Sequence, residues 1–261
     1  MTGLKDYRLD PRFSDEFDAA TLDLTKWDDS SPQWIGRAPG YFDRRNIRLR
    51  NGCLELTAAM QQPDEIPPLY RARGMGAYTT AYVTARERVL YGYFEARFQA
   101  MRANVCNAFW LHDPLDPPAK YREGDFSEEI DIFEVFGRRD TPEGMAEPNL
   151  DRTYFTTLHR LRTPYVEACV GLHNQPIRHQ QVMPFDFTED FHVGALLWTP
   201  DELVWFLDGM ELFRVPNLHY HRPLRLNIDC EIMQGWTGLP RSEDLPARYR
   251  IDYIRVYRLP Q

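Results

Sequence analysis

The sequence predicts an all-β protein, a sandwich or barrel built of short strands. Apolar residues alternate with polar ones over short runs, and these runs are rich in aromatic and β-branched residues. Glycine and proline recur between the runs at intervals that are typical of turns. No stretch shows the 3.6-residue period of a long amphipathic helix. Many short strands with almost no helix are typical of a sandwich or a barrel.

The expected strands follow one another along the chain and are separated by turns. Segments 46–59 and 248–259 alternate apolar and polar residues, and 78–101 is rich in tyrosine and phenylalanine. Shorter apolar runs complete the set at 107–112, 129–137 and 191–215. Asn51–Gly52 and Asp208–Gly209 predict tight hairpin turns, because these residue types adopt positive φ readily.

Helix contributes little to this pattern. Short helical turns are expected near 61–66 and 240–246. The chain has no internal repeat and no linker of Gly, Ser or Pro, so we expect a single domain over residues 1–261. Because the first and last segments both read as strands, the two ends of the chain should lie near each other and close the sheets.

Composition excludes several classes of protein. The net charge of −8 disfavours a general nucleic-acid binder, which needs an excess of cations. No window approaches eighteen apolar residues, so no membrane span is expected. The four cysteines, Cys53, Cys106, Cys169 and Cys230, form no CxxC pair, which excludes a zinc ribbon or a thioredoxin-like motif. Four cysteines are enough for two disulfides, but we interpret them as buried free thiols.

The segment EEIDIFEVFG holds three acids on an expected strand. Side chains alternate between the faces of a strand, so Glu129 and Asp131 share one face. Strict alternation would place Glu134 in the core, where an unpaired carboxylate costs roughly several kcal/mol. One extra residue at Ile132 or Phe133, a β-bulge, returns Glu134 to the face of the other two acids. The spacing therefore predicts a bulged strand with three acids in a row.

Three neighbouring carboxyl groups repel one another, so at least one pKa must be raised. Glycoside hydrolysis needs this arrangement: one carboxylate attacks the anomeric carbon and a protonated carboxyl donates to the leaving oxygen. The outer pair can lie about 5–6 Å apart, the separation of a retaining enzyme, while the middle acid shares a proton with the nucleophile. A solvated acidic face and a cation site of three carboxylates are the alternatives.

The sequence EIDIFE resembles the active-site signature of glycoside hydrolase family 16. Further segments resemble that family in the same order, at 14–27, 46–56, 91–98, 107–111, 198–209 and 251–259. The resemblance implies a concanavalin A-like β-jelly roll with an open concave cleft, and endo cleavage with retention of configuration. It also implies that Glu129 is the nucleophile, Asp131 the assisting acid and Glu134 the general acid/base.

The substrate is suggested by two further segments. Residues 34–46 depart from the Trp-Gly-Asn-Asn-Glu-like stretch of laminarinase-like members, and together with 217–240 they resemble agarases, porphyranases and carrageenases. This resemblance implies cleavage of β-1,4 linkages in a red-algal galactan of carrageenan, agar or porphyran type. An endo-β-1,3-glucanase, a non-catalytic carbohydrate-binding jelly roll and a transglycosylase remain the alternatives.

Aromatic side chains offer platforms on which sugar rings stack. Trp110 and His112 share one face by alternation, whereas Trp34 and Trp236 fall in loop-like segments suited to the rim of a cleft. His159 lies on the next expected strand, where it can donate a hydrogen bond at the cleaving subsite. The structural alternative for the aromatic residues is a place in the core, and for His159 it is a partly buried histidine with a backbone hydrogen-bond partner.

Arginine accounts for nearly all of the cationic residues. A sulfated galactan would need such cations, because guanidinium binds sulfate-like groups through two hydrogen bonds. The candidate arginines are Arg37, Arg71, Arg73, Arg160 and Arg162, and of these Arg37, Arg73 and Arg160 are assigned to substrate binding. Codon usage in a GC-rich genome and a solvated surface role are the alternative explanations.

No cofactor is required for this chemistry, but many members of the family carry a structural Ca²⁺ away from the cleft. The matching positions are Glu16, the carbonyl of Gly52, and Asp252, and such hard oxygen ligands suit calcium. The expected partner is a polysaccharide, with no nucleic acid or membrane involved, and we expect a monomer.

A polymer is too large to enter a cell, so the protein should act outside the cell or in the periplasm. The N-terminal sequence contains no apolar region of a signal peptide. Secretion therefore implies a leader that is absent from this chain. Action in the cytoplasm on imported fragments is the alternative interpretation.

Overall fold

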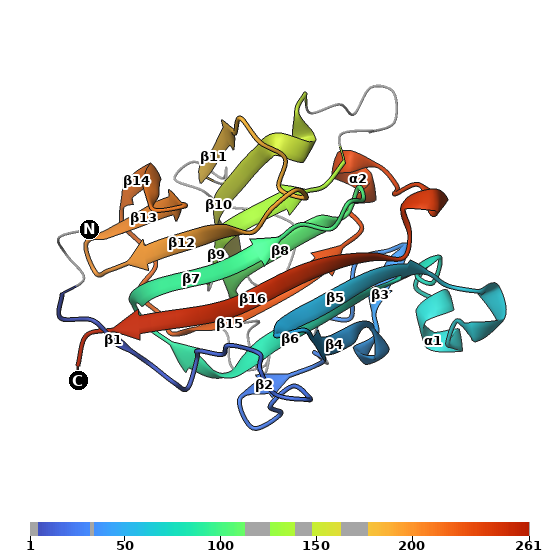
Figure 1. The fold of residues 1–261 in the computed structure, drawn as a ribbon, viewed down its shortest axis with the longest axis horizontal. Coiled ribbons are helices and arrows are strands. Elements are labelled where there is room, and N and C mark those ends of the chain that lie inside the picture. Colours follow the sequence, from blue (N-terminus) through green and yellow to red (C-terminus); the bar gives the residue numbers. More distant parts are fainter. Residues whose placement is uncertain (1–4, 32–33, 113–125, 139–147, 163–176, 261) are drawn as a thin grey trace.

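The computed structural model describes residues 5–31, 34–112, 126–138, 148–162 and 177–260. These residues form two antiparallel β-sheets that face each other, with the core between them (Figure 1). The sheets are joined where two strands pair at Ala59 with Thr79 and at Met60 with Tyr78. The predicted all-β sandwich is confirmed.

The β9 sheet carries the three acids. Its strands pair in the order β11-β10-β9-β8-β15-β6, and β2 adds to β6. The bounds are β2 (Trp27–Asp28), β6 (Tyr78–Val89), β8 (Cys106–His112), β9 (Phe126–Phe136), β10 (Thr153–Arg162), β11 (Ile177–Val182) and β15 (Leu224–Glu231). A short strand, β3 (Gly40–Phe42), runs parallel to the start of β6.

The β16 sheet covers the other side of the core. Its strands pair in the order β5-β16-β7-β12-β13-β14, with β1 on β16 and β4 on β5. The bounds are β1 (Arg8–Leu9), β4 (Ile47–Arg50), β5 (Cys53–Met60), β7 (Gly92–Gln99), β12 (His192–Trp198), β13 (Glu202–Leu207), β14 (Met210–Pro216) and β16 (Ala247–Arg258). Because Arg8 pairs with Arg258, the first and last strands meet as predicted (Figure 1).

Both predicted hairpin turns are confirmed. Asn51 and Gly52 join β4 to β5 with φ values of 53° and 70°, and Asp208 and Gly209 join β13 to β14 with φ values of 49° and 79°. Positive φ at both central residues matches the twist of the flanking strands.

The helical turns expected near 61–66 and 240–246 are 3₁₀ turns at Pro63–Glu65 and Ser242–Asp244. Two single-turn helices, α1 (Pro68–Arg71) and α2 (Gln234–Thr237), were not predicted from the pattern. Each is one turn long, too short to show a helical period.

Large aromatic side chains fill the space between the sheets. Phe133 on β9 stacks on Phe98 of β7 with ring centroids 4.1 Å apart, and both are fully buried. This contact presses the strand of the acids against the β16 sheet. Gly194 on β12 makes room for it, because a Cβ at that position would lie 2.5 Å from the Phe133 ring and 2.7 Å from the Tyr154 hydroxyl.

Gly194→Ala is therefore expected to lower the free energy of unfolding by about 1–3 kcal/mol, the usual cost of overpacking a core. Chemical denaturation measures the effect as a lower midpoint with an unchanged slope. Gly235→Ala is the matched control, because a Cβ at Gly235 meets nothing within 4 Å. Equal midpoints for Gly194→Ala and the wild type would contradict this account of the packing.

Candidate active site

The strand of the acids carries the predicted β-bulge. On β10, Thr157 pairs with Asp131 and Phe155 pairs with Glu134, so two steps on β10 oppose three steps on β9. On β8, one step opposes two at the same place, between Asp131 and Phe133. The extra residue returns Glu134 to the side of Asp131, and the buried isoleucines of the motif point into the core.

The outward side of the β9 sheet at this strand is called the acid face below. It is defined by Glu129, Asp131, Glu134, Ala108, Trp110, His112, Asn227, Asp229 and Glu231, which alternate outward along β9, β8 and β15. Glu129 lies opposite His112, and Asp131 lies opposite Trp110. The predicted common face of Trp110 and His112 is confirmed.

A tryptophan of the opposite sheet stabilises the bulge by a hydrogen bond from the core side. The buried indole Nε1 of Trp205, on β13, donates a hydrogen bond of 3.0 Å to the backbone oxygen of Asp131. A bulge disrupts the ladder of backbone hydrogen bonds, so the indole satisfies a carbonyl at the irregular position. This contact fixes the backbone at Asp131 and therefore the position of the acids relative to the core.

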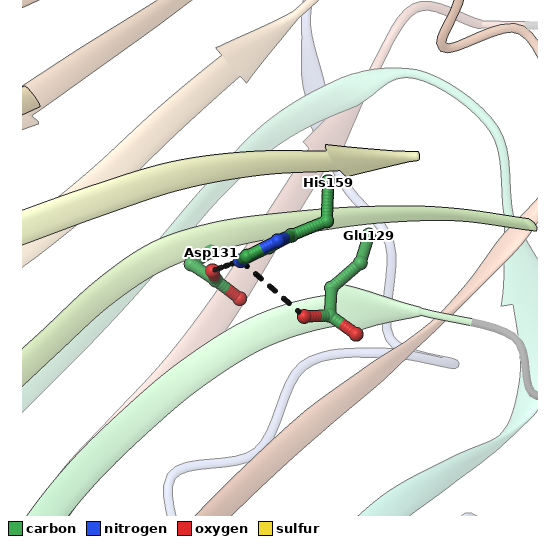
Figure 2. A group of neighbouring side chains, drawn as sticks. All are labelled: Glu129, Asp131 and His159. Carbon is green, nitrogen blue, oxygen red and sulfur yellow. Dashed lines mark ion pairs between the residues drawn. The ribbon is translucent and has the colours of Figure 1, made fainter. Parts of the chain in front are cut away.

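His159 projects from β10 towards the acids, as Figure 2 shows. Its Nε2 lies 3.2 Å from Oδ2 of Asp131 and 3.8 Å from Oε1 of Glu129. On the other side, Nδ1 of His112 lies 4.0 Å from Oε2 of Glu129. Burial, with the nearby His159 as the second cause, lowers the pKa of His112 to about 3, so His112 is neutral at neutral pH. Glu129 thus lies between two imidazoles.

Glu134 has the electrostatic properties of an acid catalyst. Burial of its carboxyl group, with the neighbouring charge of Asp131 as the second cause, raises the pKa of Glu134 to about 7. The thiol of Cys106 donates to its Oε1 at 3.5 Å, and burial raises the pKa of that thiol, so it stays a neutral donor. The prediction that one of the three acids has a raised pKa is confirmed.

Trp34 and Arg37 reach the acid face from the segment before β3. The indole Nε1 of Trp34 donates to Oε1 of Glu231 at 3.1 Å, and Nε of Arg37 donates to Oε2 of the same carboxylate at 3.3 Å. The guanidinium of Arg37 also lies over the Trp34 ring, 5.3 Å from its centroid. The structure therefore brings Trp34 and Arg37 to the face that carries the acids.

The other proposed binding residues lie in different places. Trp236 lies in α2 and packs edge-on against Phe136 and Phe155, with centroids 5.1 and 5.0 Å apart. Phe155 pairs with Glu134 in the register and Phe136 lies two residues beyond Glu134, so this small aromatic cluster lies beside Glu134 on the side of the acids. Arg73 is exposed just after α1. Arg160 follows His159 and pairs with Glu128 in the register, which places it on the opposite side of the strand from the acid face. The expectation that Arg160 lines the site is therefore wrong, because alternation turns it away.

The proposed calcium ligands are engaged elsewhere. Both oxygens of Glu16 accept from Arg255 at 2.9 Å, and Oδ2 of Asp252 accepts from Arg97 at 2.7 Å. Calcium binding together with the carbonyl of Gly52 stays a prediction, with Arg255 and Arg97 as the cations that a Ca²⁺ ion would compete with for these carboxylates. The set of described residues that could hold a metal is instead Glu129, Asp131 and His159, whose ligand atoms lie within 4.8 Å of one another.

Sequence reasoning missed the residues of β15 and the thiol of β8. Asp229 and Glu231 are buried, and they extend the acidic set across the sheet from Glu134. A signal was present, since Asn227, Asp229 and Glu231 alternate with apolar residues in LNIDCEI. Cys106 gave no signal, because an isolated cysteine reads as a core residue.

Cys53, Cys106 and Cys230 are free thiols, and Cys169 lies outside the described residues. Among the described residues, the helices are single turns, and none has the length and apolar character needed to cross a membrane.

Comparison with known proteins identifies the family. Residues 7–259 match the family described as Beta-porphyranase A-D, GH16 domain. The chain is 31% identical to Beta-porphyranase B of Zobellia galactanivorans, over 98% of this chain and 86% of that protein.

Solved structures agree with this result. The crystal structure of porphyranase B from Zobellia galactanivorans superposes with a TM-score of 0.75 at 25% identity, over 98% of this chain and 94% of that one. The laminarinase catalytic domain of Thermotoga maritima superposes with a TM-score of 0.75 at 24% identity, over 98% and 100%, which shows the shared jelly-roll fold. The chain belongs to the β-porphyranase branch of glycoside hydrolase family 16.

Proposed function

We propose that this protein is a retaining endo-hydrolase that cleaves β-1,4 galactosidic bonds in a red-algal galactan, with porphyran as the first candidate among porphyran, agar and carrageenan. The observation that carries the proposal is the bulged strand, which presents Glu129, Asp131 and Glu134 on one face beside His159. The names of the similar proteins, which include porphyranases and a kappa-carrageenase, support the substrate class.

In the first step, the carboxylate of Glu129 attacks the anomeric carbon and forms a glycosyl–enzyme ester. Glu134 simultaneously gives its proton to the glycosidic oxygen, so the C–O bond breaks and the leaving chain departs as an alcohol. In the second step, Glu134, now a carboxylate, takes a proton from water, and the oxygen of that water displaces Glu129. Two displacements at one carbon give retention of configuration.

The neighbouring groups prepare Glu129 for attack. Asp131 lies between the two outer acids in the motif and can share a proton with Glu129, and His159 contacts both Asp131 and Glu129. Neutral His112 lies near the other oxygen of Glu129. Because it is uncharged, it forms no ion pair that would compete with the substrate for the Glu129 carboxylate. The separation of the Glu129 and Glu134 carboxyl groups, about 5–6 Å in a retaining enzyme, stays a prediction.

The value of kcat/KM is expected to fall above about pH 7, roughly tenfold per pH unit, because Glu134 must be protonated to act as the acid. The raised pKa keeps the proton on Glu134 below that pH, and deprotonation above it removes the acid. A pH profile measured from about pH 5 to about pH 9 tests this, and a profile that stays flat across pH 7 would exclude Glu134 as the titrating acid.

Cys106→Ser provides the control for this assignment. A hydroxyl is a stronger hydrogen-bond donor than a thiol, so it stabilises the ionised form of Glu134. The fall of kcat/KM at high pH should then begin at a lower pH. If that fall is caused by a group other than Glu134, its position should not change.

The substrate is tested by measuring the release of reducing ends from a panel of polymers. The panel contains porphyran, agarose, κ- and β-carrageenan, furcellaran and laminarin, and Glu129→Gln serves as the blank. Cleavage of one galactan supports the proposal and identifies the polymer. Cleavage of laminarin alone would replace the galactan with a β-1,3-glucan and keep the mechanism. No release from any polymer would favour a carbohydrate-binding jelly roll.

Anion recognition by Arg37 is part of the proposed substrate specificity. Its side chain is 47% exposed, and it lies on the acid face beside Trp34. A galactan that carries sulfate esters presents the group that guanidinium binds well.

Because such polymers are extracellular, we also propose that the protein acts outside the cell or in the periplasm.

A further inference from the structure

Glu231 is a buried carboxylate with both oxygens in use. It lies on the acid face of β15 with 6% of its surface exposed. Oε1 accepts from the Trp34 indole at 3.1 Å, and Oε2 accepts from Nε of Arg37 at 3.3 Å. One side chain of the sheet therefore holds two residues that are almost 200 positions away in the chain and belong to no helix or strand.

The geometry of this contact selects one conformation of Trp34 and Arg37. Arg37 uses Nε to reach Glu231, and among the residues that the structure describes its two terminal nitrogens make no hydrogen bond, which leaves them for a substrate. The same guanidinium lies over the Trp34 ring, 5.3 Å from the centroid. Long side chains lose conformational entropy when they are fixed, so fixing Arg37 in advance removes that cost from substrate binding.

A carboxylate at this position is unfavourable for folding alone. Burial raises the pKa of Glu231, an effect that the charge and hydrogen bond of Arg37 oppose. In the register, Glu231 lies opposite Cys106, and buried Asp229 is two residues away on the same face. An apolar side chain would pack there without desolvating a charge, and the net benefit of a buried ion pair to stability is small. The free-energy cost of burying the Glu231 carboxylate is explained if this carboxylate contributes to substrate binding.

We propose that Glu231 is a positioning residue, which sets substrate affinity by holding Arg37 and Trp34 in the conformation that receives the galactan. The proposal rests on the proposed function for its substrate. Glu231 acts through the two residues it holds, and therefore affects binding of the substrate and of the transition state alike.

Glu231→Ala is expected to raise KM about tenfold and to change kcat less than about threefold, because it removes binding that ground state and transition state share. Glu231→Gln should give an intermediate KM, since its amide oxygen still accepts from Trp34 but its charge is lost. Glu55→Ala is the matched control: Glu55 is also buried beside arginines, but it lies on β5 of the other sheet. An unchanged KM for Glu231→Ala would overturn the proposal.

A double-mutant cycle with Arg37→Ala separates positioning from a general structural effect. If Glu231 acts through Arg37 and Trp34, most of the effect of Glu231→Ala on KM should disappear in the Arg37→Ala background. Fully additive effects would contradict the proposal, because they would mean that Glu231 and Arg37 act independently.

A readout that needs no substrate keeps the test independent of the proposed function. The indole N–H signal of Trp34 can be assigned by its loss in Trp34→Phe, using ¹⁵N-labelled protein. Glu231→Ala should shift this signal and speed its exchange with water, because the hydrogen bond is lost. If no polymer is cleaved, the proposed function fails while this result still tests the contact. An unaltered Trp34 signal would show that Glu231 does not hold the indole.

Discussion

Glu129→Gln is expected to reduce hydrolysis of the galactan by roughly four orders of magnitude or more, because an amide cannot form the glycosyl–enzyme ester. The substitution preserves size and planarity, so the fold should be retained. Initial rates of reducing-end release measure the effect, and a thermal melt run beside them checks that the protein is folded.

Glu128→Gln is the matched control for this experiment. Glu128 is the preceding residue on the same strand, but it is buried on the other side, where its carboxylate lies 3.7 Å from Nε of Arg222. Because Glu128 lies on the opposite side of the strand from the acid face, removing its charge should leave turnover within about threefold of the wild type. If Glu129→Gln kept activity within tenfold of the wild type, Glu129 would not be the nucleophile.

Glu134→Ala is expected to lower hydrolysis of the natural polymer about 10²–10⁴-fold, the usual contribution of a general acid. For an oligosaccharide with a nitrophenol leaving group, the loss of activity relative to the wild type should be far smaller, since such a group departs without a proton. The variant should also lose the fall in activity above about pH 7 that the raised pKa of Glu134 imposes.

Two results would exclude the acid role of Glu134. One is an equal loss for the activated and the natural substrate, because a missing proton donor affects only a poor leaving group. The other is a pH profile of Glu134→Ala with the upper limb unchanged. Glu134→Gln gives the same comparison with the size of the side chain preserved.

The strands, the hairpins and the three acids can be predicted from the chain alone, because each depends on neighbouring residues. Alternation in EEIDIFEVFG required a bulge, and the structure has it between Asp131 and Phe133. The glycines of the hairpins needed positive φ, and they have it. Local periodicity is a property of the chain, so it can be read without coordinates.

Contacts between distant residues depended on the tertiary structure. Nothing in the sequence pairs Trp34 and Arg37 with Glu231, or the Trp205 indole with the backbone of Asp131. Arg160 is different, because alternation along its own strand already turns it away from His159, and the register with β9 agrees. The motif thus identifies the acids, whereas strand order and register decide which side chains surround them, because sheet pairing joins segments that no local pattern relates.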